Sequence, residues 1–113
     1  MSKADRLERL DAQRLDDEAR FSELLLAALR DAARGSWGLF AHKPDKFTRK
    51  QWDPRVAELI ELGEQINAER AALGLEPFAL LAEFRGSRGP VPSNAPGEPK
   101  QAKAWLERLG AGS

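Results

Sequence analysis

The chain has 113 residues, and its 18 lysines and arginines balance 18 aspartates and glutamates, so its formal net charge is zero. A chain of this length can bury one modest core, and without net charge it has no global field that attracts nucleic acid or an anionic membrane. Because the sequence contains no cysteine, disulfides, thiolate zinc sites and cysteine nucleophiles are excluded.

The composition and the apolar runs indicate an all-α protein of the cytoplasm. Helix-favouring alanine, leucine, arginine and glutamate dominate, and no segment alternates long enough to suggest a strand. The first residues alternate charge with leucine, whereas a signal peptide needs an apolar run of about 7–15 residues. The longest apolar run, Leu24 to Leu29, falls far short of the roughly 18 residues of a membrane-spanning helix.

Residues 21–33 carry the strongest helical signal in the chain. Ser2 and Asp5 give a weak start signal further upstream, so we expect one long helix from about residue 4 to residue 33. A separate helix that restarts near Asp16 is the alternative, because carboxylates suit a helix N-terminus. The apolar residues at the spacing of one helix face are Phe21, Leu24, Leu25, Ala28, Leu29 and Ala32.

The first part of this helix, residues 1–20, is a charged arm whose apolar side chains have no obvious cover within the chain. Leu7 and Leu10 share the face of Phe21, but charged residues such as Asp17 interrupt that face, so we expect the arm to bury little. Such a stripe is typically buried in a partner groove or against a second copy; a frayed, exposed helix is the simpler interpretation. The candidate partner interface consists of Leu7, Leu10 and Leu15.

Residues 35–53 form a long connector that Pro44 prevents from being one helix. The connector begins with Trp37, Leu39 and Phe40, which are either buried against the core or exposed as an interaction site. Cations with interleaved aromatic rings are typical of nucleic-acid contacts, although core aromatics and a solvated basic surface are the simpler explanation. The nucleic-acid candidates are Lys43, Lys46, Phe47, Arg49, Lys50 and Trp52.

Asp53 followed by Pro54 marks the start of a second long helix, since an N-cap acceptor precedes a proline at the first helical position. A glycine in the middle of a helix costs about 0.5–1 kcal/mol relative to alanine. We therefore expect Gly63 to allow close approach of another part of the chain, with Trp37 or Ala28 opposite.

Gly74 is placed to end the second helix, and a short third helix follows over residues 77–85. Residues 86–99 hold four of the seven prolines and three glycines, a composition typical of an extended surface loop. A last amphipathic helix over residues 100–109 carries Trp105, so we expect it to return and dock on the core.

No pattern of acidic residues or histidine indicates an enzyme. Glu58, Glu61 and Glu64 share the second helix, but the Glu-x-x-His motifs of di-metal bundles are missing from the sequence, which favours a solvated face. His42 has no nucleophile and orienting acid placed beside it by any motif. We expect no catalytic residue, no metal, no cofactor and no small-molecule ligand.

Together these segments predict a small single-domain all-α bundle of two long antiparallel helices, a short third helix and a returning C-terminal helix. The predicted divisions are the arm 1–20, the core domain 21–85, the loop 86–99 and the docking helix 100–113. The predicted core consists of Phe21, Leu25, Leu29, Trp37, Leu59, Ile60, Phe78, Leu81, Trp105 and Leu106. The predicted function is a non-enzymatic protein–protein interaction or accessory role, with self-association through the N-terminal helix as one form. The alternative is a nucleic-acid-associated regulator that uses the loop 43–52.

Overall fold

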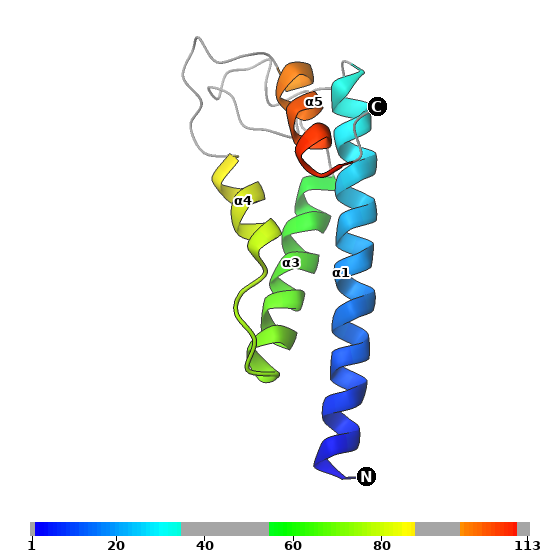
Figure 1. Cartoon of the computed structure of the whole chain (residues 1–113), viewed down its shortest axis with the longest axis vertical. Helices are drawn as coiled ribbons and strands as arrows, with labels where there is room; N and C mark the ends of the chain where they lie inside the picture. Colours follow the sequence, from blue (N-terminus) through cyan, green and yellow to red (C-terminus); the bar gives the residue numbers. More distant parts are fainter. Residues whose placement is uncertain (1, 35–54, 88–97, 111–113) are drawn as a thin grey trace.

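A computed structural model describes residues 2–34, 55–87 and 98–110 of the chain, and within these ranges every regular element is a helix. The helices are α1 (Lys3–Ala33), α3 (Arg55–Ala72), α4 (Ala79–Ser87) and α5 (Glu98–Arg108). Figure 1 shows α3 and α5 lying along α1, with α4 beside α3. The predicted all-α class is therefore confirmed. None of the helices in the described ranges is long and apolar enough to cross a membrane.

The first helix, α1, is one uninterrupted helix of 31 residues, about 46 Å long. It begins after Ser2, whose side-chain oxygen accepts a hydrogen bond from the Asp5 N–H at 3.2 Å. This cap satisfies one of the backbone donors that every helix start leaves unpaired. The expectation of one long helix is confirmed, and the alternative of a new helix starting near Asp16 is wrong.

The helix α3 runs antiparallel to α1 and ends at Ala72, and Gly74 stops it there, as the sequence predicts. Gly74 has a φ of 74°, and the Leu75 N–H donates to the Arg70 carbonyl at 2.8 Å, which is the pattern of a Schellman motif. The chain then turns back towards α4. The turn is held by the Phe78 N–H, which donates to Asn67 Oδ1 at 2.7 Å.

The core lies between α1 and the other described helices and consists largely of the residues that periodicity predicts. Ile60 and Phe78 are partly buried and pack against it, with the Phe78 ring edge-on to Phe21 at a centroid distance of 5.2 Å. Trp37 lies outside the described residues. The buried apolar residues are Phe21, Leu25, Ala28, Leu29, Ala32, Val56, Leu59, Ile66, Leu81, Phe84, Ala102, Trp105 and Leu106.

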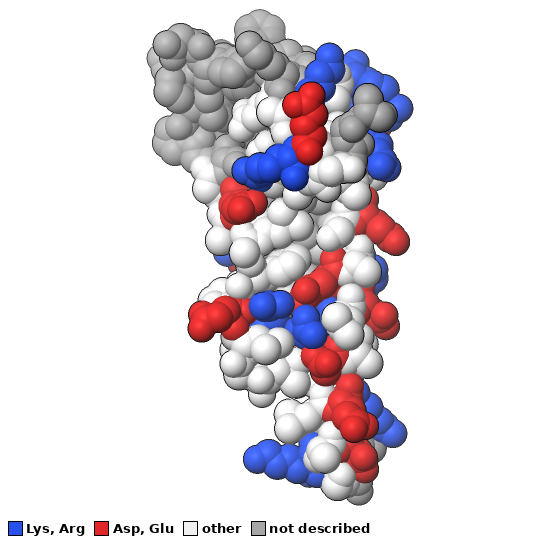
Figure 2. All heavy atoms as spheres, viewed as in Figure 1, with Lys and Arg blue, Asp and Glu red and all other residues white. Residues whose placement is uncertain are grey.

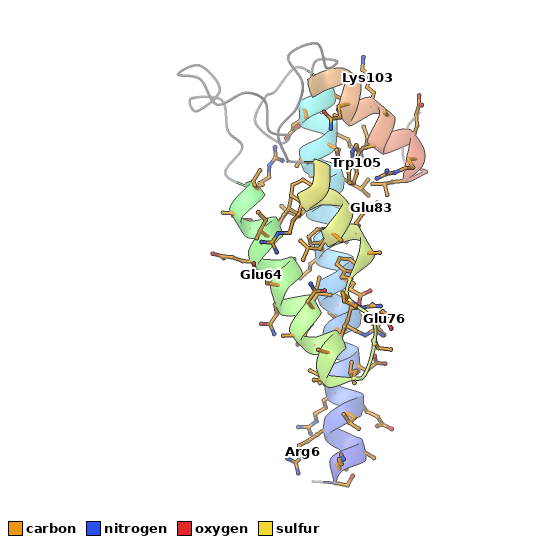
Figure 3. All side chains as sticks on the ribbon, turned by 90° about the vertical axis from the view of Figure 1, so that its left-hand side faces the viewer. Arg6, Glu64, Glu76, Glu83, Lys103 and Trp105 are labelled. Carbon is orange, nitrogen blue, oxygen red and sulfur yellow. The ribbon has the colours of Figure 1, made fainter. Side chains whose placement is uncertain are left out.

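The C-terminal helix α5 returns to the bundle and packs against α1, as its amphipathic pattern predicts. Ala102, Trp105 and Leu106 are its buried residues. The guanidinium of Arg108 lies 4.3 Å from the centre of the Trp105 ring and binds Glu83 of α4 at 3.0 Å. Arg108 therefore connects α5 to α4, in the upper part of the bundle, where Figure 3 labels Glu83 and Trp105.

At Gly63, α4 approaches α3 closely enough for the Leu81 side chain to occupy the space of a Cβ. A Cβ built on Gly63 would come within 2.4 Å of Leu81 Cδ1 and 2.9 Å of Leu81 Cγ, distances that side chains do not adopt. The prediction of a close approach at Gly63 is confirmed, but among the described residues the neighbour is not the predicted Ala28. Trp37, the other predicted neighbour, lies outside the described residues. Leu81 of α4 occupies the space instead, because α4 folds back onto the outer side of α3.

Replacing Gly63 with alanine is expected to destabilise the protein by about 1 kcal/mol. Displacing the buried Leu81 side chain costs about 1–3 kcal/mol, more than the roughly 1 kcal/mol that alanine gains in helix propensity. Chemical denaturation followed by circular dichroism measures the difference in the free energy of unfolding.

Gly86 of α4 is the matched control for this substitution, because a Cβ there would meet nothing within 4 Å. Gly86→Ala is expected to stabilise the protein by about 0.5 kcal/mol through the unfolded state. Equal stabilisation by both substitutions would show that Gly63 does not mark a close contact.

Candidate interaction site

The N-terminal part of α1 extends past the other helices as a free arm. Ion pairs at 2.9 Å join Arg55 to Asp31 and Arg70 to Glu18, and these two pairs set the antiparallel register of α3 on α1. Since α3 ends at Ala72, roughly the first three turns of α1 have none of the other described helices opposite them. Figure 1 shows this arm as the lower end of the molecule, and Figure 3 shows Arg6 on it, below the turn that carries Glu76.

Two of the three predicted interface leucines lie together on the arm. Leu7 is 39% exposed and Leu10 is half-buried, and both continue the stripe of Phe21 at alternating spacings of three and four residues, as in a helix–helix seam. Leu15 is 54% exposed, but it lies about 140° around the helix from Leu10. The structure thus groups Leu7 with Leu10 and places Leu15 on another side of α1.

Ion pairs hold the base of the arm to α3. Arg14 binds Asp11 at 2.7 Å and Glu18 at 2.8 Å, and Glu18 also binds Arg70 of α3 at 2.9 Å. The hydrogen bonds that Arg14 donates to Glu18 and, secondly, to Asp11 raise the pKa of Arg14 above its ordinary value. The charged residues that interrupt the apolar stripe therefore form a network with their neighbours.

Next to this network, two carboxyl groups are buried between α1 and α3. Asp17 and Glu69 are each only 3% exposed. Gln13 donates to Asp17 Oδ1 at 2.9 Å and Gln65 donates to Glu69 Oε2 at 3.2 Å, whereas Glu69 Oε1 is buried without a partner. Burial, and secondly the hydrogen-bonding neighbour Asp17, raise the pKa of Glu69. Two ionised carboxylates can only accept hydrogen bonds, whereas a protonated Glu69 can donate one to Asp17.

The buried pair corrects one expectation drawn from the sequence. A charged residue at position 17 suggested that this part of α1 buries little, yet Asp17 is as inaccessible as the core residues. The reason is that α3 supplies a second carboxyl, Glu69, and an amide, Gln65, at the same level. The signal available in the sequence was the position of Asp17 in phase with Phe21, which places it on the face that α3 covers.

A shallow depression of about 360 Å³ lies between α1 and α3, above the buried pair. Leu24 and Leu62 are half-buried at the depression, whereas Glu58 and Glu61 are exposed. This is the acidic face that the sequence predicts to be solvated, and no group of metal-ligating side chains in the described ranges is arranged to hold a metal ion. The residues that line the depression are Arg20, Leu24, Glu58, Glu61 and Leu62, with Glu23 in an overlapping hollow of about 340 Å³.

The surface charges of the described residues are mixed rather than gathered by sign. Figure 2 shows basic and acidic side chains side by side along the visible face, including the arm. The predicted nucleic-acid contacts all lie outside the described residues, so the alternative function remains a prediction. They are Lys43, Lys46, Phe47, Arg49, Lys50 and Trp52.

Comparison of the chain with protein-family models, with curated proteins and with solved structures found no match.

The substitution Glu69→Gln is expected to remove the loss of stability that the unaltered protein shows as the pH rises. Because the pKa of Glu69 is raised in the folded protein, its contribution to stability is complete below the ordinary pKa of a glutamate and is lost as the pH rises through the raised value. A glutamine at position 69 can donate to Asp17 at every pH, which we expect to stabilise the protein by about 1 kcal/mol above that range. Urea denaturation across a pH series measures the difference between the variant and the unaltered protein.

The exposed Glu76 in the turn after α3 provides the control, because Glu76→Gln removes the same charge without altering a buried group. At the other end of α1, Arg34 and Arg55 lower the pKa of Asp31, so the stability from Asp31 is lost as the pH falls. This loss affects all variants alike. A constant difference between Glu69→Gln and the unaltered protein at every pH would contradict the raised pKa.

Proposed function

We propose that this chain is a small non-enzymatic interaction or accessory protein of the cytoplasm, and that the arm of α1 is its binding element for a protein partner. The observation that supports this proposal is the continuation of the apolar stripe, with Leu7 and Leu10, past the end of α3. The same face that α3 covers further along α1 is left without cover by the other described helices on the arm.

An arm of this kind is suited to binding because it is already helical. Isolated helices of fewer than about 12 residues are marginal in water, but this arm is the extension of a longer helix whose remainder is packed in the bundle. A partner therefore does not have to order the arm before it gains from burying Leu7 and Leu10. The charged side chains of Arg6 and Lys3 beside the leucines are exposed, as is usual at the rim of an interface.

The polar cluster at the base of the arm supports a structural role more than a catalytic one. Asp17 and Glu69 are the buried charged side chains of the described residues, and each is only 3% exposed. Catalytic carboxylates must come within hydrogen-bonding reach of a substrate, and the packing of α3 on α1 covers these two.

Substitution of both arm leucines, Leu7→Ser with Leu10→Ser, is expected to weaken partner binding by about tenfold or more, since a buried leucine contributes about 1.5–3 kcal/mol. The tagged chain and the variant are compared by quantitative affinity capture from extracts of the native host, and by sedimentation of the purified proteins. The melting temperature should change little, because both side chains lie outside the core.

The control is Leu109→Ser, the same chemical change at a leucine that is 36% exposed just after α5, at the other end of the described bundle. This variant should capture the same partner as the unaltered chain. If the arm variant neither loses a captured protein nor alters self-association, the arm is not the binding element and the proposal fails.

A further inference from the structure

We propose that the partner of the arm is a second copy of this chain, and that the acidic depression between α1 and α3 of each copy receives the arm of the other. This inference rests on the proposed function, because it identifies what the arm binds. The arrangement is an antiparallel pair of α1 helices related by a two-fold axis.

The arm and the depression lie on the same side of α1. Arg6 and Leu24 are eighteen residues apart in one continuous helix, and eighteen residues make five full turns. Leu10 is one turn after Arg6 and lies within about 40° of it around the helix. The distance along the helix from Arg6 to Leu24 is about 27 Å, so no chain can place its own arm in its own depression.

A second copy satisfies both sites at once. Rotation by a half-turn about an axis perpendicular to α1, midway between Arg6 and Leu24, puts the arm of each copy at the depression of the other. Because the same two surfaces are used twice, the assembly closes at two copies and leaves no site free for a third. An unrelated partner that bound the arm would leave the depression empty.

The charges of the two surfaces are complementary. The depression has three carboxylates, Glu23, Glu58 and Glu61, against one guanidinium, that of Arg20. Arg20 already lies 3.7 Å from the carboxylate of Asp17. The depression is therefore suited to a basic segment, and it repels an acidic one.

The basic residues of the arm meet the acidic residues of the depression in this antiparallel register. Glu61 lines the depression with Leu24, so Arg6 of the second copy comes beside Glu61, and Lys3 comes one turn further on, beside Glu58. All four side chains are exposed, and none forms an ion pair with another residue of the described ranges. The acidic residues of the arm, Asp5, Glu8 and Asp11, lie at least about 100° around the helix from Arg6.

An apolar contact accompanies these pairs. Side chains on a helix lean towards its N-terminus, so Leu10 leans along the arm towards the level of Leu24 of the second copy. Leu24 and Leu62 are half-buried, and Leu10 would complete their cover. Leu15 lies about 140° away from Leu10 and is not part of this contact.

Charge reversal tests the arrangement, with the full chain and the sedimentation of purified protein as the readout. Arg6→Glu and Glu61→Arg should each weaken dimerisation roughly tenfold, since each reversal acts at both symmetric sites and turns an attraction into a repulsion. The double variant, Arg6→Glu with Glu61→Arg, carries swapped charges at both sites and should recover the dimer to within about twofold. Lys103→Glu is the control, because it reverses a charge on α5, at the other end of the molecule from Arg6 (Figure 3).

The apolar contact has a matched test of its own. Leu10→Ser should weaken the dimer about tenfold, whereas Leu15→Ser, at the more exposed leucine, should leave it unchanged. Circular dichroism confirms that each surface variant keeps its helix content, so that a lost dimer is not a lost fold.

Several outcomes would overturn the inference. One is a monomer at every concentration at low salt, and another is a dimer that responds equally to Leu10→Ser and Leu15→Ser. A double charge variant that stays as weak as the single ones would also exclude this register. If the chain is monomeric but its arm still captures another protein, the inference fails while the proposed function stands.

Discussion

The packing of α3 along the apolar stripe of α1 is the contact on which the rest of this structure depends. The stripe runs through Phe21, Leu25 and Leu29, and α5 packs on α1 as well, while α4 packs on α3. Because the hydrophobic effect is roughly proportional to the apolar area removed from water, the helix with the longest stripe becomes the support for the others. The described fold is therefore a set of shorter helices on one long helix, and the part of α1 that none of these helices covers becomes the arm.

Polar groups determine the position of α3 along α1. A purely apolar seam would tolerate a shift of α3 by one turn, whereas such a shift would separate Glu69 from Asp17 and Arg70 from Glu18. Unpaired polar groups in a buried seam cost more than the pairs themselves contribute, so these contacts select one register. The register in turn determines how much of α1 projects beyond Ala72. By fixing this register, the buried carboxyl pair also fixes the length of the arm that we propose to be functional.

The arm and the acidic depression lie on the same side of α1 because the helix is regular. A continuous α-helix returns to the same side every eighteen residues, so a feature on the arm and a feature on the bundle can share one face although they are far apart. No break lies between them, because α1 is one continuous helix from Lys3 to Ala33. An arm held so rigidly can present its side chains to a partner in a fixed spacing, which lowers the entropic cost of binding.

The sequence by itself determined the local features of this protein. The continuous α1, the end of α3 before Gly74 and the apolar core faces follow from periodicity, capping and turn chemistry, which act over a few residues. Only the tertiary structure decided which residues meet across helices. That Leu81 rather than Ala28 lies against Gly63, that Glu69 lies opposite Asp17, and that the depression forms beside Leu24 all depend on register and on the side from which α4 returns. A single sequence does not encode these distances in any local pattern, because they are set by the packing of whole helices.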